Sequence, residues 1–593
     1  MSKSNAPASA LGTTYTPKER NAYMVGLFGQ NMIYNIINVF TSYYLADVLM
    51  VPASAVSTIL LIAQVWDAFN DPIMGTIVDR TRSKHGKCRP YLMIMPVVIG
   101  VMTILCFSLP TYDADASDWD RNGVLLLAAV FYIFWGMTYT SGDIPIWSIS
   151  SLMTKKSADR QKLQSAGRLA AYIGTAAVML GFQPAAFAVK AMLINKSATD
   201  AGYTGFNYNE VAAEATKNAE RLVDVAIRHG WSAGSEDFIQ TSLADEKKAF
   251  LYLAIALTVI ATITFQAVGI FCRERIAPSA QKNGVIDNFK MMFRNKPYRQ
   301  ILLSGILGGT RNITMLVAMG IVTFYFASKD PTLVILYLVL LGGGLFGGMG
   351  IVTAFIPKLL QKHSKKKLYN LSNMLEFFPN VFMFLLFIFK PDGLADWYLL
   401  IPMAVMFTLK GICLGLFNTL QTVMIGDAVD YEDYTNRIRP DAVFYSGQTF
   451  IVKIGTGLSS AIYYGLRAIV GYSDDNAKLV QEYVDSGDKT IRETMGSKFF
   501  ETIKSFFEHG KDAPTGNIVH HASWNNSLIL TDDQLFVFMA LLFFCVSIIP
   551  AIGNILSLIP TWRYALDTDE YDAMHAKLQA RRAAEGEEVE EAE

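Results

Sequence analysis

The stretch VSTILLIAQVWDAFNDPIMG, Val56 to Gly75, starts as a mainly apolar run and then carries two aspartates and an asparagine. Apolar runs recur along the whole chain of 593 residues, of which 52% are hydrophobic and 17% are charged. Ordinary soluble domains have roughly 25% charged residues. Mean hydropathy is positive over the whole length. One hydrophobic patch cannot produce such averages, so many apolar segments must be present.

About twelve segments are long and apolar enough to cross a bilayer, because roughly 20 helical residues span its hydrocarbon core of about 30 Å. They lie at 21–46, 53–78, 91–110, 123–147, 166–189, 249–271, 300–327, 333–356, 368–389, 398–429, 443–470 and 533–562. The sequence therefore predicts an all-α membrane protein with twelve transmembrane helices. We expect a monomer in the lipid bilayer of the plasma membrane.

Basic residues are concentrated in alternate links between these segments. The links after the second, fourth, sixth and eighth segments are rich in Lys and Arg, whereas the link at 111–123 is acidic. The positive-inside rule then places the basic links and both termini in the cytoplasm. Residues 1–20 lack the features of a secretory signal peptide, 272–299 form a central loop, and 563–593 form an acidic tail. Its last stretch, AEGEEVEEAE at 584–593, is predicted to be solvated and to have no role in a site. A net charge of −1 indicates no nucleic-acid partner.

Features of the first half of the chain recur in the second at nearly the same offset. They are KHGK at 84–87 and KHSK at 362–365, Gly142-Asp143 and Gly426-Asp427, and polar insertions at about 190–248 and 472–532. Chance similarity of basic loops is the alternative to a duplication. A duplication predicts two six-helix halves, 21–271 and 300–562, in the major facilitator architecture, with a site near the midplane between them.

Each polar insertion is predicted to be an amphipathic helix. The apolar face is formed in the first by Val211, Ala215, Ala219, Leu222, Val223 and Ala226, and in the second by Ile491, Met495, Phe499, Ile503 and Phe506. We expect the two insertions to pack together as a small cap outside the membrane. Such a cap would either stabilise the bundle or gate the substrate, and the sequence leaves both roles open.

Asp67, Asn70 and Asp71 in the second segment stand at i, i+3 and i+4 and project from one face of a helix. An ionisable group in the membrane costs about 2.5–3.5 kcal/mol on insertion scales and normally faces the bundle interior. The acids could pair with a base such as Arg168. Hard oxygens at one place instead favour a site for a small cation, or for a proton that the two acids share.

The fourth segment, WGMTYTSGDIPIWSI at 135–149, places Thr140, Asp143 and Trp147 on one helical stripe. Thr140 offers the cation another oxygen. A buried carboxylate beside an indole suits a sugar, because the carboxylate accepts from hydroxyls and the ring stacks on the apolar face. An interfacial aromatic anchor is the alternative for Trp147. Arg168 could hold Asp143 or donate to the substrate. Lys453 is the matching base in the second half, and we group it with the substrate-binding residues.

Asp427 and Asp430, in GDAVDYEDY at 426–434, end the tenth segment. We interpret them as a cytoplasmic gate that forms ion pairs with Arg437 or Arg439. The five cysteines have the spacing of neither a disulfide framework nor a zinc site. The chain shows no nucleophile–base set, phosphate loop or enzymatic metal motif, so we expect no enzyme and no cofactor besides a coupling ion.

Four motifs, WDAFNDPIMG, RTRSKHGK, WGMTYTSGDIPIW and GDAVDYEDY, resemble the signatures of the glycoside–pentoside–hexuronide:cation symporter family. The resemblance covers all twelve segments and omits the two insertions. It implies a major facilitator fold and sugar uptake coupled to Na⁺, H⁺ or Li⁺. The resemblance places the cation site on Asp67, Asn70, Asp71 and Thr140, the sugar site on Asp143, Trp147 and Arg168, and the second-half lysine on Lys453.

One departure from the family pattern concerns substrate choice. Gln30-Asn31 stands where the melibiose-transporting members have a lysine followed by a sugar-binding aspartate. Asn31 still donates and accepts hydrogen bonds but has no charge, so we keep it in the sugar site and leave galactoside specificity open. The sequence predicts a glycoside or oligosaccharide symporter driven by Na⁺ or H⁺, and the neutral oxygen of Asn70 favours Na⁺. A lipid carrier with a lateral apolar opening is the alternative.

Overall fold

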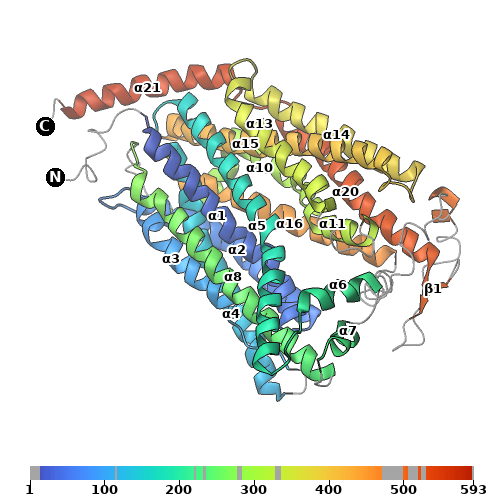
Figure 1. Cartoon of the computed structure of the whole chain (residues 1–593). Coiled ribbons are helices and arrows are strands. Elements are labelled where there is room, and N and C mark those ends of the chain that lie inside the picture. The colour runs from blue at the N-terminus through green and yellow to red at the C-terminus, as the bar shows by residue number, and fades with distance from the viewer. Residues whose placement is uncertain are drawn as a thin grey trace.

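Figure 1 shows the computed structural model of the chain, in which long helices lie side by side in two groups. The structure describes residues 14–113, 116–218, 222–231, 235–276, 284–326, 336–470, 499–501, 503–504, 518–521 and 529–590. Within these ranges, every segment expected to cross the membrane is helical over most of its length. The predicted all-α membrane fold is therefore confirmed.

The first half contains six long helices. They are α1 (Pro17–Tyr43, continued by the π-helical turn η3, Tyr44–Val48), α2 (Ala53–Arg80), α3 (Arg89–Cys106), α4 (Asp118–Leu152), α5 (Ser157–Asp200) and α8 (Ser235–Phe271). Within this half α1 packs against α5 and α8, and α3 packs against α4 and α8. The extra length of α5 and α8 carries them beyond the membrane, where the first insertion begins and ends.

The second half follows a short connecting helix, α9 (Val285–Arg294). Its helices are α10 (Lys296–Gly308), η4 (Gly309–Asn312), α11 (Ile313–Gly320), η5 (Ile321–Phe326), η6 (Leu338–Gly342), α13 (Gly343–Leu359), α14 (Lys365–Phe389), α15 (Trp397–Asn436), α16 (Asp441–Ile469) and α20 (Asp532–Thr561). The seventh predicted segment is therefore not one α-helix, because η4 interrupts it where Gly309 packs against the backbone of Gly455. The two halves meet where α2 packs on α16 and α5 on α13.

Eight helices of the described chain have the length and hydropathy of a membrane span: α3, α4, α5, α8, α13, α14, α15 and α20. Three of the remaining segments, α1, α2 and α16, carry the polar residues singled out from the sequence, such as Asn31, Asp67 and Lys453. Their polar residues lower the mean hydropathy of these three helices.

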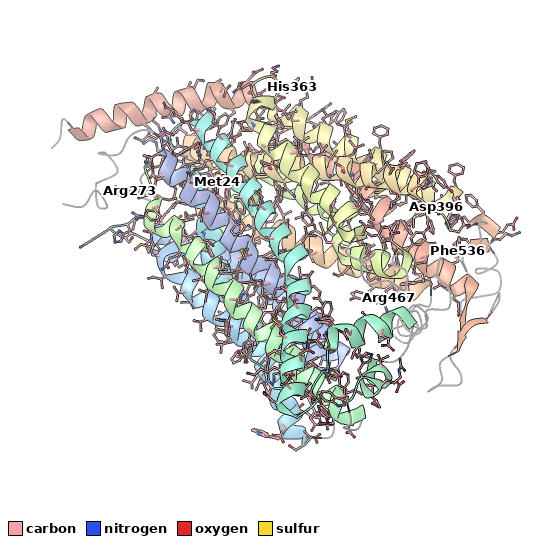
Figure 2. The ribbon with its side chains drawn as sticks, viewed as in Figure 1. Met24, Arg273, His363, Asp396, Arg467 and Phe536 are labelled. Atoms are coloured by element: carbon pink, nitrogen blue, oxygen red, sulfur yellow. The ribbon has the colours of Figure 1, made fainter. Side chains whose placement is uncertain are left out.

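The basic links and the insertions lie at opposite ends of the bundle. Figure 2 shows Arg273 and His363 of two basic links at one end, together with Met24, whereas Asp396 and Phe536 lie at the other. The helices α6 (Tyr208–Asn218) and α7 (Leu222–Arg228) and the strand β1 (Ile518–His521) also lie at that other end (Figure 1). This arrangement agrees with an even number of crossings in each half.

The first insertion forms two helices rather than the one that was predicted. The expected apolar face is largely buried, with Val211, Ala215 and Val223 packed around Trp231 and Phe238. This small core includes the extended ends of α5 and α8, because Ile194 and Ala198 of α5 and Phe238 of α8 belong to the same cluster. Of the predicted face, Ala219 lies outside the described residues, and Leu222 is only partly buried.

Most of the second insertion, including Ile491, Met495 and Phe506, lies outside the described residues, and with it the expected contact between the two insertions. Phe499 packs edge-on against rings of α14, Phe384 and Phe387. The antiparallel strands β1 (Ile518–His521) and β2 (Ile529–Thr531) were not predicted.

Gly86 of the KHGK motif has a structural role at the start of α3. Its φ is +103°, and a Cβ there would lie within 2.5 Å of the Glu274 carboxylate. That carboxylate accepts the backbone N–H groups of Lys87 and Cys88 at 2.9 and 2.8 Å, which satisfies the free donors at a helix N-terminus. Burial raises the pKa of Glu274, although these hydrogen bonds oppose the shift.

The end of the chain forms a helix, α21 (Thr568–Glu590), which packs against α15. Figure 1 shows it lying across the end of the bundle. Tyr571 and Leu578 are fully buried, and Arg581 and Arg582 pair with Asp433. Tyr571 enters the ion-pair network described below, and it precedes the acidic run at 584–593 that was predicted to have no role in a site.

Candidate functional site

The two aspartates of α2 meet a lysine from the other half of the protein. Lys453 of α16 places its Nζ 2.8 Å from Asp71 Oδ1 and 3.2 Å from Asp67 Oδ2. Thr140 of α4 donates its hydroxyl to the same Asp71 Oδ1 at 3.1 Å. Helices α2, α4 and α16 therefore converge on one carboxylate.

Close packing of α4 on α2 depends on Gly136. A Cβ at this position would stand 2.8 Å from Asp67 Oδ1, which is closer than real Cβ contacts allow. The Asp71 side chain is fully buried, whereas 19% of the Asp67 side chain and 16% of the Lys453 side chain are exposed. The cluster is thus closed on the Asp71 side and open on the Asp67 side.

Two polar atoms in this cluster lack a hydrogen-bond partner within the described chain, Asp71 Oδ2 and Asn70 Nδ2. An unpaired buried polar group costs about 1–3 kcal/mol. The nitrogen and oxygen of an asparagine amide are interchangeable by a flip of the side chain, so Asn70 also offers an oxygen here. The donor set of carboxylate, amide and hydroxyl oxygens fits a small hard cation.

Lys453 was predicted among the substrate-binding residues, and the structure shows it in contact with the acids of the cation cluster. Arg168 was the base that the acids were predicted to be able to pair with. The lysine instead lies on Asp67 and Asp71, because α16 packs against α2 along the seam between the halves. Its ammonium belongs to the candidate cation site.

Asp143 is surrounded by hydrogen-bond donors from three helices. Its Oδ1 accepts from Gln30 Nε2 at 2.7 Å and from Trp147 Nε1 at 3.1 Å, and its Oδ2 accepts from Thr449 Oγ1 at 3.0 Å. Asn31 donates to Gln30 Oε1 at 2.6 Å and to a backbone carbonyl. Asn31 therefore acts on Asp143 through Gln30, a residue that the sequence analysis did not assign to the site.

Trp147 and Arg168 form a stacked pair. The Arg168 guanidinium lies 4.1 Å from the centre of the Trp147 ring, which is within cation–π range. Its Nε and Nη2 donate to Thr422 of α15 at 3.1 and 2.7 Å, and no hydrogen bond to Asp143 occurs within the described residues. Only 5% of Trp147 is exposed, so the alternative of an interfacial anchor is wrong.

The two subsites are one helical turn apart on each of two helices. On α4, Thr140 of the cation cluster precedes Asp143 by three residues, and on α16 Thr449 precedes Lys453 by four. Side chains with this spacing are neighbours on a helix surface, about 5–6 Å apart between Cβ atoms. A displacement of α4 or α16 at one subsite therefore reaches the other.

Ion pairs join the two halves at the basic end of the bundle. Arg160 of α5 donates to Asp430 Oδ2 at 2.6 Å and to Asp427 Oδ1 at 2.8 Å. Asp427 also accepts from Lys365, and Arg439 pairs with Asp430 at 2.8 Å. Asp430 thus has one of its expected partners, whereas the partners of Asp427 are Arg160 and Lys365. The reason is that Asp427 faces α5 and α14, one turn before Asp430 on α15.

Arg437, the other expected partner, ends α15 instead. It adopts a left-handed conformation with φ of +57°, and its side chain is exposed. Tyr571 of α21 donates to Asp430 and accepts from Arg160, both at 2.9 Å. The C-terminal helix therefore contributes to this end of the protein, which no pattern in the sequence indicated.

A second bridge between the halves involves Lys87, in the link between α2 and α3. Its Nζ donates to Asp79 at 2.6 Å and to Asp441 of α16 at 2.9 Å. Burial lowers the pKa of Lys87, but Asp441 and Asp79 raise it more, so the pKa lies above its usual value. Asp79 also accepts the backbone N–H of Val443 at 2.9 Å. In the sequence, Lys87 belongs to a basic link and to the KHGK motif, neither of which indicated an ion pair between the halves.

Two helical halves with a buried polar site between them define a membrane carrier of the major facilitator class. The sequence profile of one family, described as MFS/sugar transport protein, matches residues 22–486. The chain belongs to this family and is a transporter rather than an enzyme.

Known relatives are similar over most of the chain. The symporter YnaJ of Bacillus subtilis (strain 168), named as uncharacterized, is 25% identical over 75% of this chain and 81% of its own. The putative glycoside/cation symporter YagG of Escherichia coli (strain K12) is 24% identical over 78% of this chain and 85% of its own. The isoprimeverose transporter of Lactiplantibacillus pentosus is 22% identical over 81% of this chain and 86% of its own. The crystal structure of the major facilitator transporter FucP in the outward conformation covers 90% of this chain and 98% of its own, at 7% identity and a TM-score of 0.49.

Proposed function

We propose that the protein is a sugar:cation symporter that takes up a glycoside or short oligosaccharide together with one monovalent cation. The observation that carries this proposal is the position of the two subsites. Thr140 and Lys453 both contact Asp71. Each lies one helical turn from a residue of the other subsite, Thr140 from Asp143 on α4 and Lys453 from Thr449 on α16. The names of the relatives, which include a glycoside/cation symporter and an isoprimeverose transporter, support the substrate class.

The charges of the cation cluster favour a single monovalent ion. Two ionised aspartates and one ammonium leave a net charge of −1 at Asp67, Asp71 and Lys453. A charge buried without a counter-charge is costly. One Na⁺ or one proton neutralises the cluster, so the loaded carrier moves through its conformations without an unpaired charge. The site residues fit either ion, and the Asn70 amide favours Na⁺.

In this mechanism, Lys453 competes with the coupling ion. With the cation absent, the ammonium bridges both acids and holds α16 of the second half against α2 of the first. A cation at Asp71 Oδ2 and Asn70 weakens that bridge and lets α16 adjust. Thr449, one turn away on α16, then releases Asp143 to accept hydroxyl groups of the sugar, whose apolar face stacks on the indole of Trp147.

We propose alternating access on the basis of the ion pairs at the basic end of the bundle. The bridges formed by Arg160 and Lys87 close this end, and we assign the end to the cytoplasm on the basis of its positive charge. Such a state receives substrate from outside. Rocking of the halves breaks these bridges and opens the site to the cytoplasm.

Transport by purified protein in liposomes tests the proposal. A panel of glycosides is offered under separately imposed Na⁺ and H⁺ gradients, and accumulation is measured. The proposal predicts accumulation with one gradient, and sugar and cation must raise each other's affinity by the same factor. Sugar binding that is indifferent to both Na⁺ and pH would overturn it.

A lipid carrier is the second candidate, because a lateral apolar groove does exist between α5 and α13. The ten residues that line this groove include no Lys or Arg for a lipid headgroup. Movement of a labelled lysolipid across the same liposomes, without sugar transport, would favour this candidate over the symporter.

A further inference from the structure

A groove lies in the seam where α5 and α13 meet, two helices that Figure 1 shows side by side. Its volume is about 490 Å³, and five residues of each helix line it. All of them are apolar, aromatic or glycine, and their one polar group is the hydroxyl of Tyr172. The groove is separate from the polar subsites, although Leu169 in its wall directly follows Arg168.

The groove opens away from the protein, towards the membrane. Ile173 of α5 is 54% exposed and Ile351 of α13 is 60% exposed. Both residues lie in helices with the hydropathy of a membrane span. Apolar side chains exposed at this depth face lipid hydrocarbon, so the material that enters the groove comes from the bilayer.

The glycines of α13 have two different roles. Gly348 permits close packing on α15, because a Cβ there would lie 2.4 Å from the carbonyl oxygen of Thr408. A Cβ at Gly343 or Gly350 would meet its nearest neighbour at 3.9 or 3.4 Å, and one at Gly347 would meet nothing within 4 Å. The glycines on the groove side therefore relieve no clash with protein, and their effect is to leave space.

The dimensions of the groove match one lipid chain. The wall from Leu169 to Leu180 is about 16 Å long at 1.5 Å per residue. This length is roughly half of the 30 Å hydrocarbon core, or the depth of one leaflet. The groove lies in the half of the membrane nearer the basic links, since α5 begins at that end with Ser157.

We propose that this groove binds one acyl chain of a phospholipid from the leaflet next to the basic links. The chain lies between the two halves and contacts both α5 and α13. Because α5 also carries Arg168, a bound chain steadies the helix that holds the wall of the sugar subsite. Lipid binding here is independent of which ion or sugar the protein transports.

Photo-crosslinking in proteoliposomes tests the proposal on the full chain. The probe is a phosphatidylcholine with a diazirine on one acyl chain, and adducts are mapped by peptide mass spectrometry. We expect adducts to concentrate on residues 169–180 and 343–351. Gly347→Phe fills the groove without a backbone clash and should lower these adducts about tenfold, equivalent to about 1.4 kcal/mol of binding.

Gly465→Phe on α16 is the matched control, because a Cβ there also meets nothing within 4 Å and the residue does not line the groove. It should leave the adducts unchanged. Ala176→Phe fills the groove from the facing helix and replaces Gly347→Phe if that variant does not fold. Adducts that are no denser than on the exposed face of α4, or that survive both filling variants, would overturn the proposal. Displacement of the probe by an alkyl glycoside would also overturn it, because the occupant would then be part of a substrate.

Discussion

Lys453 of α16 and Asp71 of α2 form an ion pair across the two halves of the protein, with 2.8 Å between Nζ and Oδ1. The ion pair links the candidate cation site to the contact between the two halves, which must rearrange during transport. Asp71 has a second carboxylate oxygen with no partner within the described chain, so the same side chain can hold the lysine and a cation in turn. Variants of this cluster can therefore test whether Lys453 only joins the two halves or also takes part in coupling to the cation.

Replacing the lysine should make protein stability depend on the cation. Lys453→Met leaves Asp71 buried without its partner, and breaking a buried pair costs about 3–5 kcal/mol. We expect a lower melting temperature in the absence of the coupling ion, and recovery when Na⁺ is added. Lys453→Arg keeps the charge, so its melting temperature should depend less on Na⁺. Thermal unfolding across a Na⁺ series measures both, and a loss of stability that no cation restores would make the lysine a purely structural bridge.

Gly136 should be required for the position of Asp67. Gly136→Ala places a methyl group 2.8 Å from Asp67 Oδ1 and moves that carboxylate, so we expect cation affinity to fall about tenfold, or 1.4 kcal/mol. Gly123→Ala, on the same helix, meets nothing within 4 Å and should leave affinity unchanged. Titration calorimetry with Na⁺ compares the two variants. Equal affinities would show that Asp67 is not a ligand.

Arg160 should hold the basic end of the protein closed. Arg160→Gln removes ion pairs to Asp427 and Asp430 and leaves both acids buried. We expect the halves to separate at this end, so that spin labels at the exposed residues Lys84 and Lys367 move apart. Arg437→Gln removes an exposed charge of the same kind and should leave the label distance as it is. If the two variants have the same label distance, Arg160 does not hold this end of the protein closed.

Acidic pH should loosen the C-terminal helix. His575 of α21 stacks on Tyr571 at 5.3 Å, and burial lowers its pKa from 6.5, with a smaller effect of Arg160 in the same direction and an opposing effect of Asp430. The packed helix therefore favours the neutral imidazole. Its contribution to stability is present above pH 6.5 and is lost as the pH falls through the lowered pKa.

Hydrogen exchange of residues 568–582 at pH 7.5 and pH 5.5 measures this loss. The His575→Asn variant should show no such pH dependence once intrinsic exchange rates are corrected. If wild type and variant respond alike, another group controls the packing of α21.

Local features of the site were accessible from the sequence, whereas contacts between distant helices were not. Helical periodicity places Asp67 and Asp71 on one face of a helix, and likewise Thr140 and Asp143. The bond between Lys453 and Asp71 joins residues 382 positions apart and depends on how α16 packs on α2. The same reason explains why Tyr571 and Gln30 were missed, since a tyrosine in a tail and a glutamine in a span carry no periodic signal.

The sharpest test of coupling compares Asp67 with Asp143. Asp67→Cys removes a ligand of the cation cluster but leaves the donors around Asp143 in place. We expect it to bind sugar and to carry sugar down a gradient, while accumulation driven by a cation gradient is lost. Asp143→Cys removes the acceptor that Gln30 and Thr449 share, so both sugar binding and transport should be lost while cation binding persists. Transport assays with and without an ion gradient, together with direct binding of each ligand, distinguish the two. If both variants lose both properties equally, the aspartates support the structure rather than the ligands, and two separate subsites do not exist.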